Sequence, residues 1–229
     1  AHTQIAQRYR NESDETIEAI YVFPLPSEGV LLGMEIDISG KKLNGTVQSN
    51  NQARNTYEDA VTGGNGAFLL RQLSNGLYQM NVGNLKPGEE AEIRIRYGEI
   101  LRWSGNTLRY RLPTVVAPHY GDPGAAGISR EDVPNTALLV EYPLTLGMMI
   151  KGDLARAEMS SPSHAVEIER GESSTLVRLS KDASLDRDFI LTFGMDAPSA
   201  WEVLTAPDGD GFVALGCLNV PTLGASNKT

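Results

Sequence analysis

Residues 90–97 read EAEIRIRY, and their pattern predicts the fold class. Its apolar members Ala91, Ile93, Ile95 and Tyr97 alternate with acidic and basic residues. A period of two is the pattern of a β-strand that has one buried face and one solvated face. Because the same alternation recurs along the chain, the sequence predicts a mainly β fold made of antiparallel β-sandwich units.

Turn residues separate the alternating runs at short intervals. Ser74-Asn75-Gly76, Lys86-Pro87-Gly88 and Ser104-Gly105-Asn106 are examples. Many short strands at this spacing favour a sandwich or a barrel. Within residues 31–38 we expect one shared face for four apolar side chains: Leu32, Met34, Ile36 and Ile38.

Residues 49–61 break the alternation. Four apolar side chains recur there at the spacing of one helical face: Ala53, Tyr57, Ala60 and Val61. Ser49 or Asn50 can cap the start, and Gly63-Gly64 can end the helix with a left-handed residue. The sequence therefore predicts one main helix near residues 50–61, inside the first β unit.

The chain of 229 residues is long enough for two β units. Residues 118–135 are rich in glycine and proline and lack periodicity, which is typical of a boundary. We expect a β domain at residues 1–121, a linker or long loop at 122–135, and a second β-sandwich-type supporting domain at 136–229. Both ends look abrupt, so we expect this chain to be part of a longer protein.

Charge and cysteine content exclude several classes of function. The formal net charge is −9, and an acidic surface repels phosphate backbones, so we expect no nucleic-acid partner. Cys217 is the one cysteine, so the chain can form neither an intrachain disulfide nor a cysteine metal cluster. It lies in an apolar run, residues 212–218, where we expect a buried and inert thiol.

The residues that could carry chemistry do not form a convergent set. His2, His119 and His164 stand far apart, with no zinc-ligand spacing between them. Asp208-Gly209-Asp210-Gly211 resembles the start of a calcium loop, but position twelve is Asn219 where a bidentate Glu is needed. We therefore expect no catalytic residue, no cofactor and no metal site in this chain, which we do not expect to be an enzyme.

A set of blocks in a fixed order resembles a known family. These blocks are residues 7–11 (QRYRN), 19–26 (AIYVFPLP), 53–57 (ARNTY), 82–89 (VGNLKPGE) and 111–120 (RLPTVVAPHY). They resemble the vault protein inter-alpha-trypsin (VIT) domain over roughly the first half of the chain. His119 departs from the pattern, which commonly has Arg there. The resemblance implies a module N-terminal to a von Willebrand factor A (vWA) domain, as in inter-alpha-trypsin inhibitor heavy chains and bacterial VIT–vWA surface proteins.

The resemblance also implies a function and a location. We expect a non-catalytic protein-interaction or scaffold module of an adhesion-type protein that is secreted, periplasmic or on the cell surface. Its partners would be a downstream vWA domain in the same chain and a protein or extracellular-matrix ligand. Residues 182–186 resemble the metal motif of vWA domains, but Asp186 stands where the second hydroxyl belongs, so we expect the vWA domain itself to be absent from these residues.

Two alternatives come from the residues themselves. A sandwich-type glycoside hydrolase needs paired carboxylates, and the chain has 29 acidic residues, so no pair is excluded. A carbohydrate- or calcium-binding lectin-like module would use Asp208 or Asp210. In addition, the apolar strand at residues 212–218 predicts an exposed sheet edge or apolar patch in the second unit, through which the chain could form a homodimer.

Overall fold

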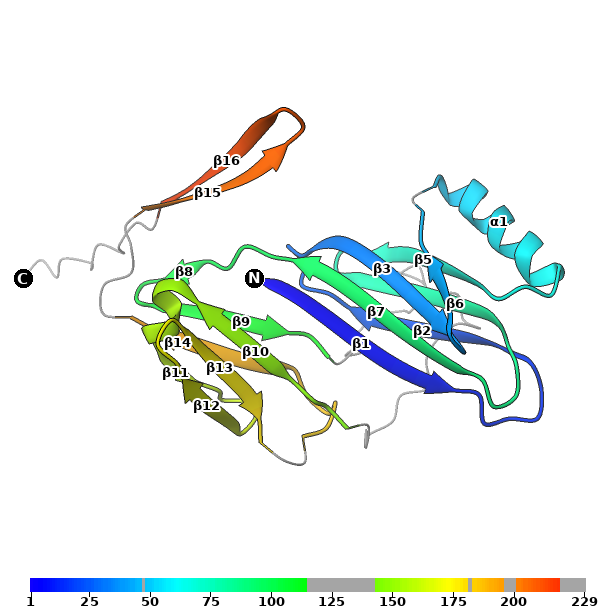
Figure 1. The fold of residues 1–229 in the computed structure, drawn as a ribbon, viewed down its shortest axis with the longest axis horizontal. Helices are drawn as coiled ribbons and strands as arrows, with labels where there is room; N and C mark the ends of the chain where they lie inside the picture. The colour runs from blue at the N-terminus through cyan, green and yellow to red at the C-terminus, as the bar shows by residue number, and fades with distance from the viewer. Residues whose placement is uncertain (47, 115–142, 181–182, 196–200, 219–229) are drawn as a thin grey trace, which may run out of the picture. The chain divides into compact units, whose positions relative to one another are not determined.

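The computed structural model describes residues 1–46, 48–114, 143–180, 183–195 and 201–218 (Figure 1). For residues 201, 202, 204, 217 and 218 it describes the backbone alone. The chain divides into two compact units, the first built mainly from Ala1–Ile100 and the second from Leu101–Arg111, Pro143–Ala183 and Phe189–Thr229. The expected linker at 122–135 lies outside the described residues, and the expected domain boundaries stay a prediction.

The first unit is a sandwich of two antiparallel sheets. One sheet has the strand order β1-β7-β3-β4 and the other β2-β6-β5. The strands are β1 (His2–Arg10), β2 (Ile17–Pro24), β3 (Val30–Ile38), β4 (Lys41–Asn44), β5 (Ala67–Ser74), β6 (Leu77–Leu85) and β7 (Glu90–Gly98). The fold is therefore mainly β and antiparallel, as the alternation predicts.

The core of this unit lies between the two sheets. Ile93, Ile95 and Tyr97 project from β7 and are buried, as expected. The rings of Tyr9 on β1 and Tyr21 on β2 lie 5.4 Å apart and join the sheets across the core. A row of aromatic rings continues along the second sheet, from Tyr21 to Phe23 at 5.2 Å and from Phe23 to Tyr78 at 5.7 Å.

One expected face is wrong at its first residue. Met34, Ile36 and Ile38 are buried or half-buried, but Leu32 is 56% exposed. The register between β3 and β7 shifts between Leu31 and Gly33. Such a β-bulge inserts one extra residue and turns its side chain away from the expected face.

The single α-helix of the described chain, α1 (Asn50–Thr62), lies against the three-stranded sheet (Figure 1). Tyr57 is its buried residue, and the other members of the predicted face are half-buried. Ser49 is the N-cap residue, without a side-chain hydrogen bond, and Gly64 has a left-handed φ of 74°. Helix, bounds and ending agree with the sequence prediction.

The second unit contains two larger sheets and a hairpin. The sheets have the orders β10-β13-β12 and β11-β14-β9-β8, and β15-β16 forms the hairpin. The elements are β8 (Trp103–Ser104), β9 (Thr107–Leu112), β10 (Gly147–Lys151), a 3-10 helix η3 (Gly152–Arg156), β11 (Glu158–Ser160), β12 (Val166–Arg170), β13 (Ser174–Leu179), β14 (Phe189–Gly194), β15 (Trp201–Asp208) and β16 (Gly211–Leu218). Buried Val177, Phe189, Leu191 and Phe193 form the centre of its core.

Candidate interaction surfaces

Two of the three histidines singled out by the sequence lie within the described residues. His2 is exposed at the start of β1. His164 lies in the second unit, where its ring is 5.9 Å from the ring of Phe189 and its Nδ1 is 3.0 Å from the Oγ of Ser163. His119 lies outside the described residues. The two described histidines thus belong to different units, in different surroundings.

The described acidic turns have different surroundings. Asp208 and Asp210 are exposed at the turn of the β15–β16 hairpin. Asp186 accepts two hydrogen bonds from the guanidinium of Arg187, at 3.1 and 2.6 Å. Across the described ranges, no group of three His, Cys, Asp or Glu side chains is placed to hold a metal ion.

A polar cluster attaches α1 to the outer face of the three-stranded sheet. The Tyr57 hydroxyl donates to Glu18 on β2 at 2.5 Å, and Asn81 on β6 donates to the same carboxylate oxygen at 3.0 Å. Burial, followed by the hydrogen bond and the charge of Glu18, raises the pKa of Tyr57 well above its usual value. Gly83 makes room for this contact, because a Cβ at that position would meet Val61 and lie 2.9 Å from the Tyr57 hydroxyl.

The side chain of Asn84 caps the C-terminal end of α1. Asn84 adopts a left-handed φ of 56°, and its amide nitrogen donates to the carbonyls of Val61 at 2.8 Å and Asn65 at 2.9 Å. A side chain from β6 therefore satisfies carbonyls at the helix C-terminus, where four have no intrahelical partner. The turn after it spans Lys86–Glu89. Sequence reasoning included Asn84 only within the block at residues 82–89 and missed its capping role, for which the tolerance of Asn for left-handed φ was the one signal.

Asn11 is a structural residue as well. Its side-chain nitrogen donates to the carbonyls of Glu15 and Leu85, and its oxygen accepts from the backbone N–H of Ser13. The residue is 1% exposed. Because the amide is enclosed and fully used, it holds the β1–β2 connection against the end of β6.

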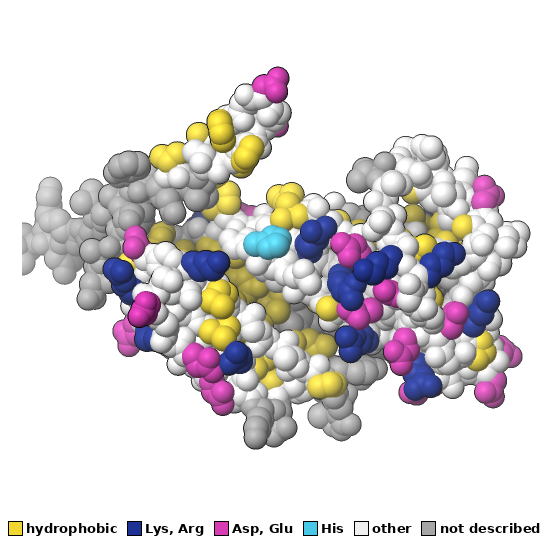
Figure 2. Space-filling view, viewed as in Figure 1, with side chains coloured by type: hydrophobic (Ala, Val, Ile, Leu, Met, Phe, Trp, Pro, Cys, Tyr) yellow, Lys and Arg dark blue, Asp and Glu magenta, His cyan; other side chains and the backbone are white. Residues whose placement is uncertain are grey.

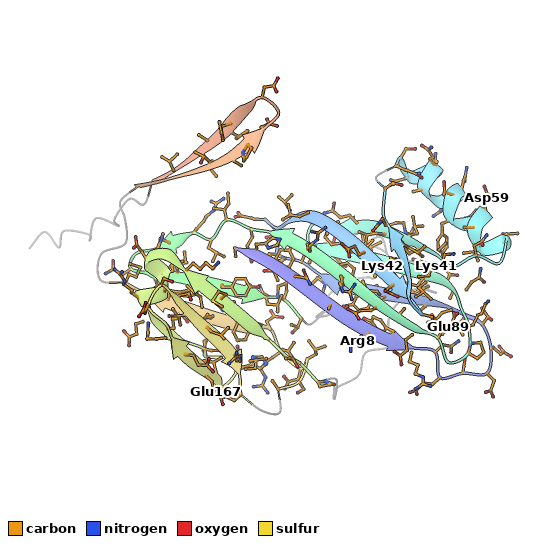
Figure 3. The ribbon with its side chains drawn as sticks, in the orientation of Figure 1. Arg8, Lys41, Lys42, Asp59, Glu89 and Glu167 are labelled. Atoms are coloured by element: carbon orange, nitrogen blue, oxygen red, sulfur yellow. The ribbon has the colours of Figure 1, made fainter. Side chains whose placement is uncertain are left out.

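The outward face of the four-stranded sheet is covered by charges of both signs (Figure 2). Arg8, labelled in Figure 3, pairs with Glu92 at 3.1 Å, and Arg94 pairs with the same carboxylate at 2.6 Å. Desolvation acts to raise the pKa of Glu92, but these two arginines outweigh it and lower that pKa. Arg96 lies across Gly33 and pairs with Glu35 at 3.7 Å. This face is therefore a neutralised, solvated surface.

One corner of the same sheet is apolar. Val30 and Leu32 on β3 are 63% and 56% exposed, and Ile100, just past β7, is 47% exposed. Val30 pairs with Gly98, whose missing side chain leaves space beside Leu32. We call Val30, Leu32 and Ile100 the β3 patch. Contiguous apolar surface rimmed by polar residues is a feature of protein-interaction sites.

The β15–β16 hairpin is the second apolar surface. Val203, Phe212, Val213 and Leu215 are exposed large hydrophobic residues there, and Phe212 reaches 79%. The strands pair with each other from Trp201 opposite Leu218 to Asp208 opposite Gly211. Within the described chain neither strand pairs with a third.

Comparison with known proteins shows which family the first unit resembles. The model of the vault protein inter-alpha-trypsin domain matches residues 1–97, which contain both sheets of the first unit. Residues 1–97 are a VIT domain. Val30 and Leu32 of the β3 patch lie within the VIT domain. The hydrogen bond between Tyr57 and Glu18 lies within it as well.

The relatives of this VIT-containing chain are longer proteins. The human von Willebrand factor A domain-containing protein 5A is 31% identical over 79% of this chain, which spans 24% of that protein. The human protein mono-ADP-ribosyltransferase PARP4 is 28% identical over 88% of the chain and 12% of its own length. A von Willebrand factor A domain-containing protein of Dictyostelium discoideum is 30% identical over half of the chain. The VIT domain here is thus of the kind associated with vWA domains.

The similarity to the first two relatives extends beyond the VIT domain, because residues 1–97 make up less than 79% of the chain. The second unit therefore shares part of this relationship. Among the described residues, no helix has the length and apolar character needed to cross a bilayer.

Proposed function

We propose that this chain is a non-catalytic scaffold module that binds a vWA domain of the same protein and presents it to a protein or extracellular-matrix ligand. The observation that carries the proposal is the VIT match together with relatives that contain vWA domains. The β3 patch supplies a surface for the contact, since three exposed apolar side chains there lie beside a charge-neutralised face. The module also self-associates through an exposed sheet edge in this proposal.

The contact with the vWA domain can be tested directly. The gene is sequenced beyond the codon for Thr229. Any vWA domain that it encodes there is purified and titrated with this chain in a calorimeter. Val30→Lys/Leu32→Lys should weaken the affinity at least tenfold, because two desolvated charges would enter the contact. Gln4→Lys/Ala6→Lys is the matched control, since it adds the same charge at exposed positions of β1 on the same sheet.

Three results would overturn this function. The gene could encode no vWA domain, the purified domain could fail to bind, or both double variants could bind with equal affinity. Circular dichroism of each variant shows whether the sandwich is still folded.

The proposed location is outside the cytoplasm: secreted, periplasmic or at the cell surface. Its support is the resemblance of the sequence blocks to secreted and surface VIT–vWA proteins. Fractionation of the source cells with an antibody against this chain tests it, and recovery of the protein with cytoplasmic markers alone would contradict it.

A further inference from the structure

We propose that the outer edge of β16 pairs with β16 of a second copy, so that two hairpins form one four-stranded antiparallel sheet with Ala214 on the two-fold axis. This inference deepens the self-association of the proposed function and needs no vWA domain. An isolated two-stranded hairpin is at best marginally stable in water, whereas three or more strands with an apolar face are stable. The β15–β16 hairpin pairs with no third strand of the described chain and exposes apolar side chains on both of its faces.

The two edges of the hairpin differ in their chemistry. The sequence of β15, WEVLTAPD, contains proline and two acidic residues, whereas β16, GFVALGCL, has neither proline nor charge. Proteins block sheet edges with charges and proline, because proline has no N–H to give to a further strand. The β15 edge is therefore protected and the β16 edge is open.

The register follows from the geometry of antiparallel pairs. Residues directly opposite one another point to the same face of a sheet, so a two-fold axis pairs even-numbered residues of β16 with even-numbered ones. With Ala214 opposite its own copy, Phe212 lies opposite Gly216 and Val213 opposite Leu215. No atom lies within 4 Å of the place where a Cβ of Gly216 would be. Across the axis Phe212 would fill that space, as aromatic side chains do beside glycines in sheets.

Charge decides between a parallel and an antiparallel pair. The chain carries a net charge of −9, and Asp208 and Asp210 are at the hairpin turn. A parallel pair would place the two acidic turns side by side. The antiparallel pair separates them by about six residues of strand, roughly 20 Å, which exceeds the screening length in physiological salt. A second copy in antiparallel register is therefore the occupant that fits this edge.

Disulfide trapping tests the register. Ala214→Cys in a Cys217→Ser background places two thiols across the axis, with about 5.5 Å between the Cα atoms, which is within disulfide range. Mild oxidation should convert most of this variant to a covalent dimer on a non-reducing gel. Ala206→Cys in the same background is the matched control, because Ala206 is an equally exposed alanine on β15. It should stay monomeric, and equal cross-linking of both variants would overturn the register.

Association in solution tests the edge itself. Light scattering of the 229-residue chain at micromolar concentration should give twice the monomer mass of 24.8 kDa. Val213→Lys/Leu215→Lys should raise the dissociation constant at least 100-fold, because each lysine would lie opposite another, and the matched Val203→Lys/Thr205→Lys on β15 should not. Mixing the lysine variant with Val213→Glu/Leu215→Glu should restore a heterodimer.

A chain that is monomeric at all concentrations overturns the proposal. The proposal is also overturned if another segment of a longer protein covers the hairpin. In that case the hairpin would show slow hydrogen exchange in the longer protein, and the 229-residue chain would be monomeric. Neither result affects the vWA titration, so the self-association and the contact with the vWA domain are tested separately.

Discussion

The strands β7 and β16 have the same antiparallel hydrogen bonding and opposite surroundings. β7 is paired on both sides, by β1 and β3, with its apolar face buried and its charged face solvated. β16 is paired on one side, and every side chain described on it is exposed. The difference lies in patterning, since β7 alternates and β16 is apolar throughout. Alternation is typical of a strand with one buried and one solvated face, whereas an uninterrupted apolar run is typical of a strand buried on both faces. β16 has the second pattern, yet its described side chains are exposed.

The largest effect on stability is expected from replacing phenylalanine by alanine, once in the core of the first unit and once on the hairpin. Phe23→Ala should lower the free energy of unfolding by about 3–5 kcal/mol, because Phe23 is 3% exposed between the rings of Tyr21 and Tyr78. Phe212→Ala on the hairpin should change it by less than about 0.5 kcal/mol in dilute solution. Urea denaturation followed by fluorescence measures both. Equal losses would show that the hairpin is buried in the monomer.

The next largest effect on stability is expected from replacing Gly83, with Gly216 as the matched control. Gly83→Ala should cost about 1–3 kcal/mol, because the new methyl group would overlap Val61 and the Tyr57 hydroxyl of α1. Gly216→Ala has open space and should be neutral or slightly stabilising, since alanine has less backbone freedom to lose. Thermal melts at low protein concentration compare the two variants. A neutral Gly83→Ala would mean that the helix does not pack closely on β6.

A smaller effect is expected from the hydroxyl of Tyr57. Tyr57→Phe removes the donor to Glu18 and should cost about 1.5 kcal/mol at neutral pH, the lower end of the range for a hydrogen bond to a charged group, because Asn81 still donates to the same carboxylate. The matched control is Tyr78→Phe, which leaves the aromatic row of the core in place.

The same variant predicts a pH dependence whose sign is fixed. The pKa of Tyr57 is raised by burial and by Glu18, so the folded state keeps the phenol protonated while the unfolded chain ionises above pH 10. The contribution of the protonated Tyr57 phenol to the free energy of unfolding is complete below pH 10. Above pH 10 this contribution falls by about 1.4 kcal/mol per pH unit. The difference between the wild type and Tyr57→Phe should therefore shrink between pH 10 and 11. A constant difference over that range would contradict the buried phenol.

The sequence predicted the faces of strands better than their partners. Ile93, Ile95 and Tyr97 are buried because period two fixes the face of a strand. The same period does not state which strand lies alongside, so the pairing of β1 with β7 and of β9 with β14 was not predictable. The bulge at Leu32 changes one residue of an otherwise correct face. The Tyr57–Glu18–Asn81 cluster joins three elements distant in sequence, and no local pattern indicates it.

The smallest expected effect concerns the acidic turn of the hairpin. Calcium requires six to eight oxygen ligands, and this exposed turn contributes the two carboxylates of Asp208 and Asp210. Titration of the chain with calcium, magnesium or manganese should give no heat beyond dilution, and the melting temperature should be unchanged in millimolar calcium. Asp208→Asn/Asp210→Asn should behave identically to the wild type. Micromolar binding that this double variant abolishes would favour the lectin-like alternative, and it would give the hairpin an ion as a partner in place of a second strand.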